Sequence, residues 1–166
     1  AFCGVLAASL GVMVCNLTIG KKKYADVENE IKNVKDELFK TKTKFLELAE
    51  KDNEAFNKVM DSFKLPKNNQ EEIVIRNIAI EKATLEAAEV PFDVIKLVKE
   101  TLPLITIVAE KGNKNSVSDA GVAASLLSTA TEGAYLNVLI NCSSLSNQTL
   151  ANEFLIKAEI IYNEVK

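Results

Sequence analysis

The sequence predicts an all-α, dimeric protein. Each chain is expected to form a bundle of about six helices, one of which is long. Its 166 residues include only six Gly and three Pro, so turns are scarce and segments are long. Apolar residues recur in steps of three and four, the period of a helix. Hydrophobic residues make up 48% and charged residues 26%, which is typical of a globular protein. We therefore expect residues 1–166 to form a single helical domain.

The first expected element covers the uncharged segment from Ala1 to Leu17. Its length is near the lower limit, about 17 residues, for crossing a bilayer. Many of its residues are small, which suits a helix packed closely on all sides, and no second apolar segment of that length follows. We predict a buried core helix and no membrane partner.

The long helix is expected between Tyr24 and Phe63, because this stretch contains neither Gly nor Pro. Alternating steps of four and three define one stripe along it. The stripe consists of Val27, Ile31, Val34, Leu38, Thr41, Phe45, Leu48, Asp52, Ala55 and Val59. It is mostly apolar, so this face is predicted to pack against the rest of the bundle.

A break around Pro66 separates the long helix from a further helix predicted at about 70–89. Its buried positions are expected to include Ile73, Ile80 and Leu85. Pro91 suits the first turn of a helix, where its missing N–H would be unpaired in any case. It therefore predicts another helix, which runs toward Ala109 and is kinked at Pro103.

The stretch GNKNSVSDAG connects this helix to the next. Gly112 is expected to end the preceding helix in a left-handed conformation. Ser116 and Asp119 resemble a capping box in which Asp replaces Glu, and a first-turn carboxylate also complements the helix dipole. The helix that starts here is predicted to run to about Cys142, and a last helix follows from Thr149 to the end.

Composition argues against several functional classes. The chain carries 23 acidic and 20 basic side chains and a single arginine, Arg76, so a nucleic-acid partner is not expected. It has no histidine, so a metal site would need thiolates and carboxylates alone, and none is predicted. Three cysteines without a CxxC spacing are expected to be small buried hydrophobes in a reduced, cytoplasmic compartment.

Asp52 interrupts the stripe of the long helix at a position where Leu, Ile, Val or Phe would be expected. A carboxylate that faces the interior of a bundle loses hydration, which raises a carboxyl pKa and permits proton transfer near neutral pH. Alternatively, the helix tolerates one polar position, or Asp52 pairs with a lysine. The pattern alone leaves these interpretations open.

Two further groups of polar residues allow both a structural and a binding interpretation. Asn137 and Asn141 are four residues apart on an otherwise apolar helix, where buried amides need hydrogen-bond partners. They either satisfy nearby backbone groups or line a polar pocket. The run from Lys21 to Lys23 is either a solvated cluster or a contact for an anionic tail.

Five segments carry a family resemblance: NLTIGKKKY, LAEKDNEAFNKVMDSFKLPK, VPFDVIKL, VAEKGNKNSVSDAGVAA and GAYLNVLIN. Together, and in this order across nearly the whole chain, they are similar to the formiminotetrahydrofolate cyclodeaminase family. Members usually begin with a Pro-Gly-Gly-Gly-(Ser/Ala) turn before the first apolar helix. Ala1 lies after the place of that turn, and no formiminotransferase domain accompanies these segments.

The resemblance implies a homodimeric ammonia-lyase of histidine degradation that cyclises 5-formiminotetrahydrofolate to 5,10-methenyltetrahydrofolate and releases ammonia. The family's catalytic aspartate precedes a Glu-Ala-Phe motif, which places that role at Asp52. Reduced folate, with or without a polyglutamate tail, would be the substrate, and no other cofactor is expected. The expected substrate-binding residues are Lys22 and Lys23 for the glutamate tail, Asn113 and Asp119 for the pterin, and Asn137 and Asn141 in the pocket.

Two rival functions are compatible with the same residues. One is a methenyltetrahydrofolate cyclohydrolase of the same family, which hydrolyses the methenyl product, and no residue in the sequence separates the two reactions. The other is a non-catalytic helical interaction protein whose stripe is only a dimer seam. Asp52 argues against the second, because a seam optimised for packing would carry Leu at that position.

Overall fold

The computed structural model describes residues 1–165, which form an all-α bundle with no strand in that range, as the sequence predicts. The helices are α1 Phe2–Thr18, α2 Glu28–Phe63, α3 Gln70–Lys111, α4 Val117–Ser143 and α5 Gln148–Val165. Two short 3₁₀ turns, η1 Lys22–Tyr24 and η2 Lys114–Ser116, precede α2 and α4. The expected count of about six helices is corrected to five over these residues.

The count differs because the segments predicted as helices at about 70–89 and 91–109 form one helix, α3, of 42 residues. Pro91 and Pro103 both lie inside it. A proline within a helix removes the hydrogen bond to the carbonyl four residues earlier. For Pro91 that carbonyl belongs to Ala87, and the Asn141 side chain of α4 donates to it instead, at 2.9 Å.

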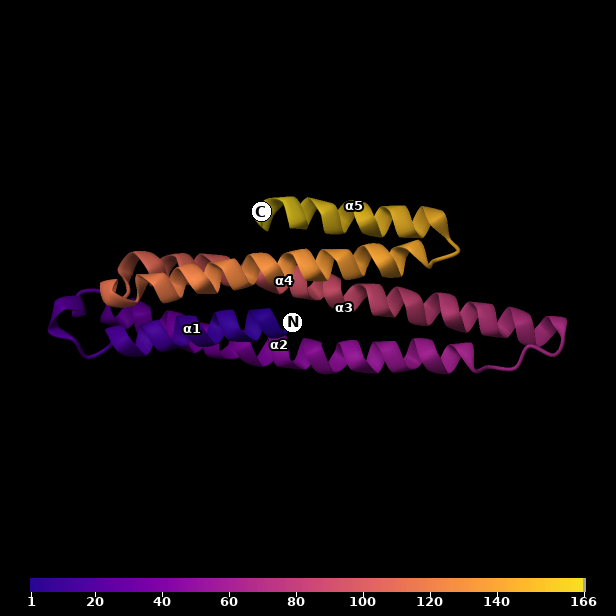
Figure 1. The fold of residues 1–166 in the computed structure, drawn as a ribbon, viewed down its shortest axis with the longest axis horizontal. Coiled ribbons are helices and arrows are strands. Elements are labelled where there is room, and N and C mark those ends of the chain that lie inside the picture. Colours follow the sequence, from indigo (N-terminus) through magenta and orange to yellow (C-terminus); the bar gives the residue numbers. More distant parts are fainter. Residues whose placement is uncertain (166) are drawn as a thin grey trace.

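Consecutive helices run antiparallel, and α5 lies along the outside of the bundle (Figure 1). The first helix has 17 residues and α2 has 36, so α1 covers only about half of α2. Beyond the Ala1 end of α1, the α2–α3 hairpin extends furthest from the rest of the bundle (Figure 1). In the described chain, α1 therefore lies beside the part of α2 that is remote from the α2–α3 turn.

Glycines allow α1 to approach its neighbours closely. A Cβ atom at Gly4 would lie 2.5 Å from the Phe45 ring, and one at Gly11 would lie 2.8 Å from Leu38 and Ile105 side-chain atoms. The predicted core helix is confirmed on this side. The expectation of burial on all sides is wrong, because four large apolar side chains of α1 are exposed: Phe2, Leu6, Met13 and Leu17.

No helix within residues 1–165 is long and apolar enough to cross a membrane.

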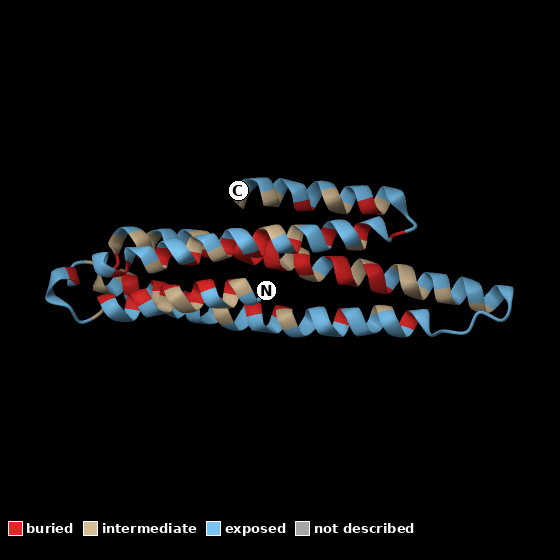
Figure 2. Cartoon of the chain, in the orientation of Figure 1, coloured by how far each residue is buried: buried red, intermediate tan, exposed pale blue. Residues whose placement is uncertain are grey.

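The buried face of α2 follows the predicted stripe. Its buried members are Ile31, Val34, Leu38, Thr41, Phe45, Leu48 and Ala55. Asp52 is the exception, because it is exposed. Figure 2 shows that α2 is mostly exposed beyond the point where α1 begins. Ile73, which was expected to be buried, is exposed for the same reason, since it lies near the projecting end of the hairpin.

Gly112 ends α3 in an extended conformation, with φ −75° and ψ −176°, so the expected left-handed conformation is wrong. Among residues 1–165, only Gly20 has a positive φ. Space explains the glycine at position 112, because an added Cβ would clash with the Val108 carbonyl and lie 3.1 Å from Val14.

The predicted capping box at the start of α4 does not form. Within the described chain, Ser116 makes no side-chain hydrogen bond to the helix end. Instead, Asn113 accepts a hydrogen bond from the Asn115 N–H at 3.1 Å and so stabilises η2. Asp119 lies in the first turn of α4, as expected, where its carboxylate faces the positive end of the helix dipole.

Candidate active site

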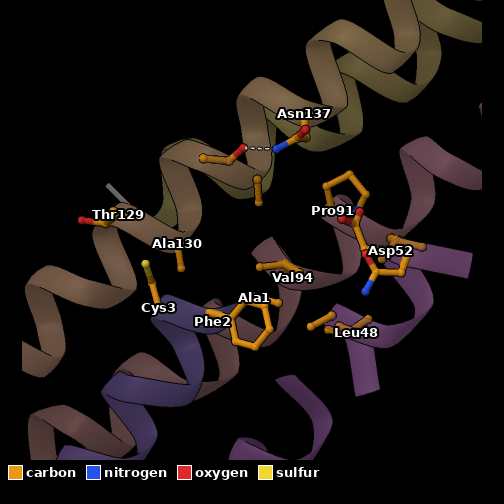
Figure 3. A pocket seen from close by; sticks show the side chains of 15 residues that line it. Ala1, Phe2, Cys3, Leu48, Asp52, Pro91, Val94, Thr129, Ala130 and Asn137 are labelled. Carbon is orange, nitrogen blue, oxygen red and sulfur yellow. Dashed lines mark hydrogen bonds between the residues drawn. The ribbon is translucent and has the colours of Figure 1, made fainter. Parts of the chain in front are cut away.

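An open cavity of about 400 Å³ lies where the Ala1 end of α1 meets α2, α3 and α4 (Figure 3). This volume is within the range of small-molecule pockets, about 300–1,000 Å³. Most lining residues are apolar or small, and the polar ones come from three helices: Cys3, Asp52, Asn53, Thr129 and Asn137. Few polar groups in an otherwise apolar lining are typical of a site that orients one ligand.

The second helix brings Asp52 to the wall of this cavity, one turn after the buried Leu48. Asp52 faces this open cavity instead of packed side chains. The expectation that it is desolvated is therefore wrong for the single chain, where the residue is exposed. It forms no ion pair with any lysine of residues 1–165, so the expected alternative of a lysine partner is also not observed.

Asn137 reaches the same cavity from α4, on the opposite side from Asp52 (Figure 3). Its Nδ2 donates to the Gly133 carbonyl one turn earlier, at 2.9 Å. That bond holds the amide in place, and within residues 1–165 no hydrogen bond to its Oδ1 is found. The structure thus brings together an aspartate and an asparagine that are distant in sequence.

Asn141 does not line the cavity, although it was grouped with Asn137 from the sequence. It is half-buried, and its Nδ2 donates to the backbone carbonyl of Ala87 in α3. Of the two interpretations left open by the sequence, satisfaction of nearby backbone is the one observed. The observed contact of Asn141 is thus one between helices, and its contact with substrate stays a prediction.

The other predicted binding residues lie beyond the opposite end of α1. Lys22 and Lys23 are exposed in η1, and Asp119 is half-buried in the first turn of α4. The cavity is at the start of α1, and 17 residues of helix span about 25 Å. Within one chain, these three residues are not brought together with Asp52.

Asn113 is part of the internal hydrogen bonding at that far end. It is buried, and its Nδ2 donates to the Leu17 carbonyl at 3.0 Å. Its Oδ1 accepts from the Asn115 N–H at 3.1 Å and from the Tyr24 hydroxyl at 3.5 Å. The NH2 group and the oxygen of the Asn113 side chain therefore both have partners inside the chain, and its contact with substrate stays a prediction.

Sequence reasoning did not identify several lining residues, among them Thr129 and Pro91. A spacing of four residues places Thr129, Gly133 and Asn137 on one face of α4, and this pattern was available in the sequence. Pro91 gave no such signal, because it was interpreted as the start of a helix. Its place in the cavity wall depends on α3 continuing through it.

The three cysteines differ in their surroundings. Burial raises the pKa of Cys15 to about 11, and it also raises the pKa of Cys142. Both are buried, as expected, and remain thiols at neutral pH. Cys3 is only half-buried and lines the cavity, which corrects the expectation for that residue. Within residues 1–165, no three His, Cys, Asp or Glu residues gather to hold a metal ion.

Comparisons with known proteins show which family this chain resembles in sequence and fold. The sequence model described as "Formiminotransferase-cyclodeaminase" matches residues 1–159. A methenyltetrahydrofolate cyclohydrolase of Methylorubrum extorquens is 40% identical over 159 residues, which cover 96% of this chain and 76% of that protein.

Other relatives carry the cyclodeaminase name. A formimidoyltransferase-cyclodeaminase of Gallus gallus is 30% identical over 148 residues, and the match spans 27% of that longer protein. The crystal structure of formiminotetrahydrofolate cyclodeaminase from Thermotoga maritima superimposes with a TM-score of 0.79 at 35% identity. That match covers 99% of this chain and 79% of the solved one, so the fold is shared along nearly the full length.

Proposed function

The chain belongs to the formiminotransferase-cyclodeaminase family of folate one-carbon enzymes, and from this premise we propose that it cyclises 5-formiminotetrahydrofolate to 5,10-methenyltetrahydrofolate. The observation that carries the proposal is the position of Asp52. It is a carboxylate in the wall of a mostly apolar cavity of suitable volume, at the position expected for the catalytic aspartate.

The reaction requires proton transfer between two nitrogens of the substrate. N10 of the folate attacks the carbon of the protonated formimino group, which forms the N10–C bond and leaves a tetrahedral centre that carries a neutral NH2 group. Asp52 takes the proton from N10 and delivers it to that amino group. The C–N bond then breaks, ammonia leaves, and the methenyl bridge remains. One carboxylate can perform both transfers in turn.

The exposure of Asp52 in the single chain is compatible with this role. A carboxylate on an open cavity wall is accessible to a substrate that enters the cavity. Substrate that fills the cavity displaces water from the same carboxylate, and the apolar lining strengthens its interaction with the reacting nitrogens. We therefore propose that the Asp52 carboxylate is desolvated in the complex with substrate. The sequence led us to expect this desolvation already in the folded chain.

Asn137 is the proposed anchor for the pterin or its linker. Its Oδ1 is an acceptor on the cavity wall, and the pterin ring carries several N–H donors. Val90, Pro91 and Val94 of α3 provide an apolar wall for the flat ring.

The alternative is a methenyltetrahydrofolate cyclohydrolase, and the 40% identity to the Methylorubrum extorquens protein favours it specifically. In that reaction water attacks the methenyl carbon, a base takes a proton from the water, and one C–N bond opens to leave a formyl group. Asp52 would serve as that base. The same cavity and carboxylate fit both reactions, which differ in the nucleophile and the leaving nitrogen.

Two assays on the purified protein separate the reactions. With 5-formiminotetrahydrofolate, a cyclodeaminase releases ammonia and forms the methenyl chromophore in equal amounts. With 5,10-methenyltetrahydrofolate, a cyclohydrolase removes that chromophore faster than the uncatalysed rate. Turnover of neither folate, together with no increase in Tm on addition of reduced folate, would contradict the proposed function and leave the non-catalytic alternative.

We also propose that the protein is a homodimer that pairs through the apolar surface around the cavity. Exposed apolar side chains lie on the three helices that flank it: Phe2 and Leu6 on α1, Phe56, Met60 and Phe63 on α2, and Leu136 and Ile140 on α4. Monomeric proteins rarely expose so many large apolar residues in one region. A second copy on this surface would also close the open side of the cavity.

Lys22 and Lys23 remain a proposed contact for the glutamate tail, with a restriction that follows from the fold. They lie about 25 Å from the cavity along α1. Glutamates of a folate tail are linked through their γ-carboxyl groups, so each extended unit covers more than the about 3.5 Å of an α-linked residue. The proposed contact therefore applies to polyglutamate tails.

A further inference from the structure

Asn141 is hydrogen-bonded to a residue of another helix that is distant in sequence. It belongs to α4, but its Nδ2 donates to the Ala87 carbonyl of α3, at 2.9 Å. Ala87 is buried, and the residue four positions later is Pro91, which has no N–H to donate. The side chain of one helix thus provides the hydrogen bond that the backbone of the other lacks.

Pro103, the second proline of α3, shows that this arrangement is specific to Pro91. The carbonyl that Pro103 leaves unpaired belongs to Lys99, and both residues are exposed. Water can therefore satisfy that carbonyl, and no side chain is needed. The Ala87 carbonyl is buried between α3 and α4, so without Asn141 it would remain unsatisfied, which is costly.

The hydrogen bond lies next to the cavity. Pro91 lines the cavity on α3, and Asn137, one turn before Asn141, lines it on α4. The bond from Asn141 to Ala87 therefore joins the two helices that form facing walls, within one turn of the lining residues on each. The bond is therefore a direct contact that fixes one wall against the other.

We propose that Asn141 is a positioning residue for the active site, which acts by pairing with the carbonyl that Pro91 leaves free. The proposal rests on the proposed function for its effect on catalysis. It assigns Asn141 no contact with substrate. The ring of Pro91 faces the ligand. Asn141 makes a proline tolerable at this position of α3. The same hydrogen bond fixes α4, and with it Asn137, against α3.

The test compares four proteins: wild type, Asn141→Leu, Pro91→Ala and the double variant. Asn141→Leu removes the donor and keeps a similar volume. Pro91→Ala restores a backbone N–H for the Ala87 carbonyl, so it makes Asn141 dispensable if the proposal is correct. Pro103→Ala is the matched control, because its carbonyl is exposed. Each protein is measured for Tm without folate and for kcat/KM with whichever folate the wild type converts.

Asn141→Leu is expected to lower kcat/KM about tenfold and Tm by about 3–6 °C in the wild-type background. In the Pro91→Ala background the same substitution is expected to change kcat/KM by less than about threefold and to leave Tm nearly unchanged. Pro103→Ala should keep the wild-type kcat/KM. An Asn141→Leu protein that fails to fold alone and folds as the double variant would support the same coupling.

Three results would overturn the proposal. Equal losses of kcat/KM in both backgrounds would mean that Asn141 acts on substrate directly. A lower Tm with unchanged kcat/KM would make the bond structural only. Unfolding of Asn141→Leu in both backgrounds would separate Asn141 from Pro91. A wild type that converts neither folate would contradict the proposed function instead, whereas the coupling in Tm is measured without any folate.

Discussion

At the scale of single residues, Asp52 combines two properties that rarely occur together in a helix. It continues the apolar stripe of α2, yet it is exposed and lines an open cavity instead of packing in the core. A hydrophobic residue at this position would be exposed to water and would not contribute to packing, whereas a carboxylate is solvated until a ligand arrives. The position therefore suits a reactive group better than a packing residue.

Asp52→Asn is expected to keep the fold and much of the folate affinity, and to lower turnover by about 10²–10⁴, the range for loss of a positioned acid–base group. The measurement is kcat at saturating substrate on protein confirmed as helical by circular dichroism. Glu54→Gln is the matched control, because Glu54 is exposed and does not line the cavity. A loss smaller than about threefold at Asp52 would be incompatible with general acid–base catalysis.

Asn137→Leu is expected to weaken binding of reduced folate by about 1–3 kcal/mol, because a donor of the ligand would lose its acceptor. Helicity should not change, since the existing hydrogen bond of Asn137 is to its own helix. Isothermal titration with folate measures the affinity, and Asn152→Leu on the exposed face of α5 is the control. Unchanged affinity with a lower Tm would make Asn137 a structural residue.

At the scale of elements, the close approach of α1 to α2 and α3 decides where the cavity lies. Small residues on the inner face of α1 allow it to fill the groove between the longer helices as far as Ala1. Ala1, Phe2 and Cys3 at the start of this segment line the cavity, so the packing of α1 also positions part of the cavity wall.

Gly4→Ala is expected to lower the free energy of unfolding by about 1–3 kcal/mol, the usual cost of overpacking a core. The added methyl group would lie 2.5 Å from the Phe45 ring. Gly121→Ala, in the exposed part of α4 with nothing within 4 Å, is expected to raise it by about 0.5–1 kcal/mol through helix propensity. Urea unfolding measures both, and equal effects of the two variants would contradict the close contact.

At the scale of the whole molecule, the apolar surface around the cavity connects assembly with activity. The helices that line the cavity, α1, α2 and α4, also carry exposed large apolar residues. If a second copy covers this surface, the site is complete only in the dimer. Activity should then depend on protein concentration as well as on single residues.

Phe56→Glu and Leu136→Glu are each expected to convert a dimer to a monomer in light scattering at micromolar concentration. Both side chains are well exposed in one chain, at 61% and 56%, so the substitutions should not unfold it. Ile156→Glu is the matched control, because Ile156 is exposed to 59% but lies on α5, away from this surface. A wild type that is monomeric, or variants that remain dimeric, would contradict the proposed interface.

The remaining prediction at this scale concerns Lys22 and Lys23. Replacing both by Ala is expected to raise KM for substrate with a long polyglutamate tail and to leave KM for the monoglutamate unchanged. The difference should decrease at high salt, because the interaction is between exposed charges. An equal change in KM for both substrates would argue against a tail contact at this distance from the cavity.

The sequence by itself determined the all-α class, the long striped helix and the place where Asp52 interrupts the stripe. These depend on local information, because the period of apolar residues is set by the geometry of one helix, and an interruption of that period is visible without any neighbour. The family resemblance agreed with the same residue. The spacing of Thr129, Gly133 and Asn137 on one face was equally available, although its meaning depended on what faces it.

Only the tertiary structure decided how each polar residue is used. Asn137 and Asn141 have the same residue type and lie on the same helix, yet one borders a cavity and the other pairs with Ala87, because the proline that frees that carbonyl is 50 residues away in α3. Asp52 was expected to be desolvated but is exposed, and Asn113 is buried. The physical reason is that a side chain's partners belong to whichever element packs against it, and the length and path of that element are not encoded in the residues beside it.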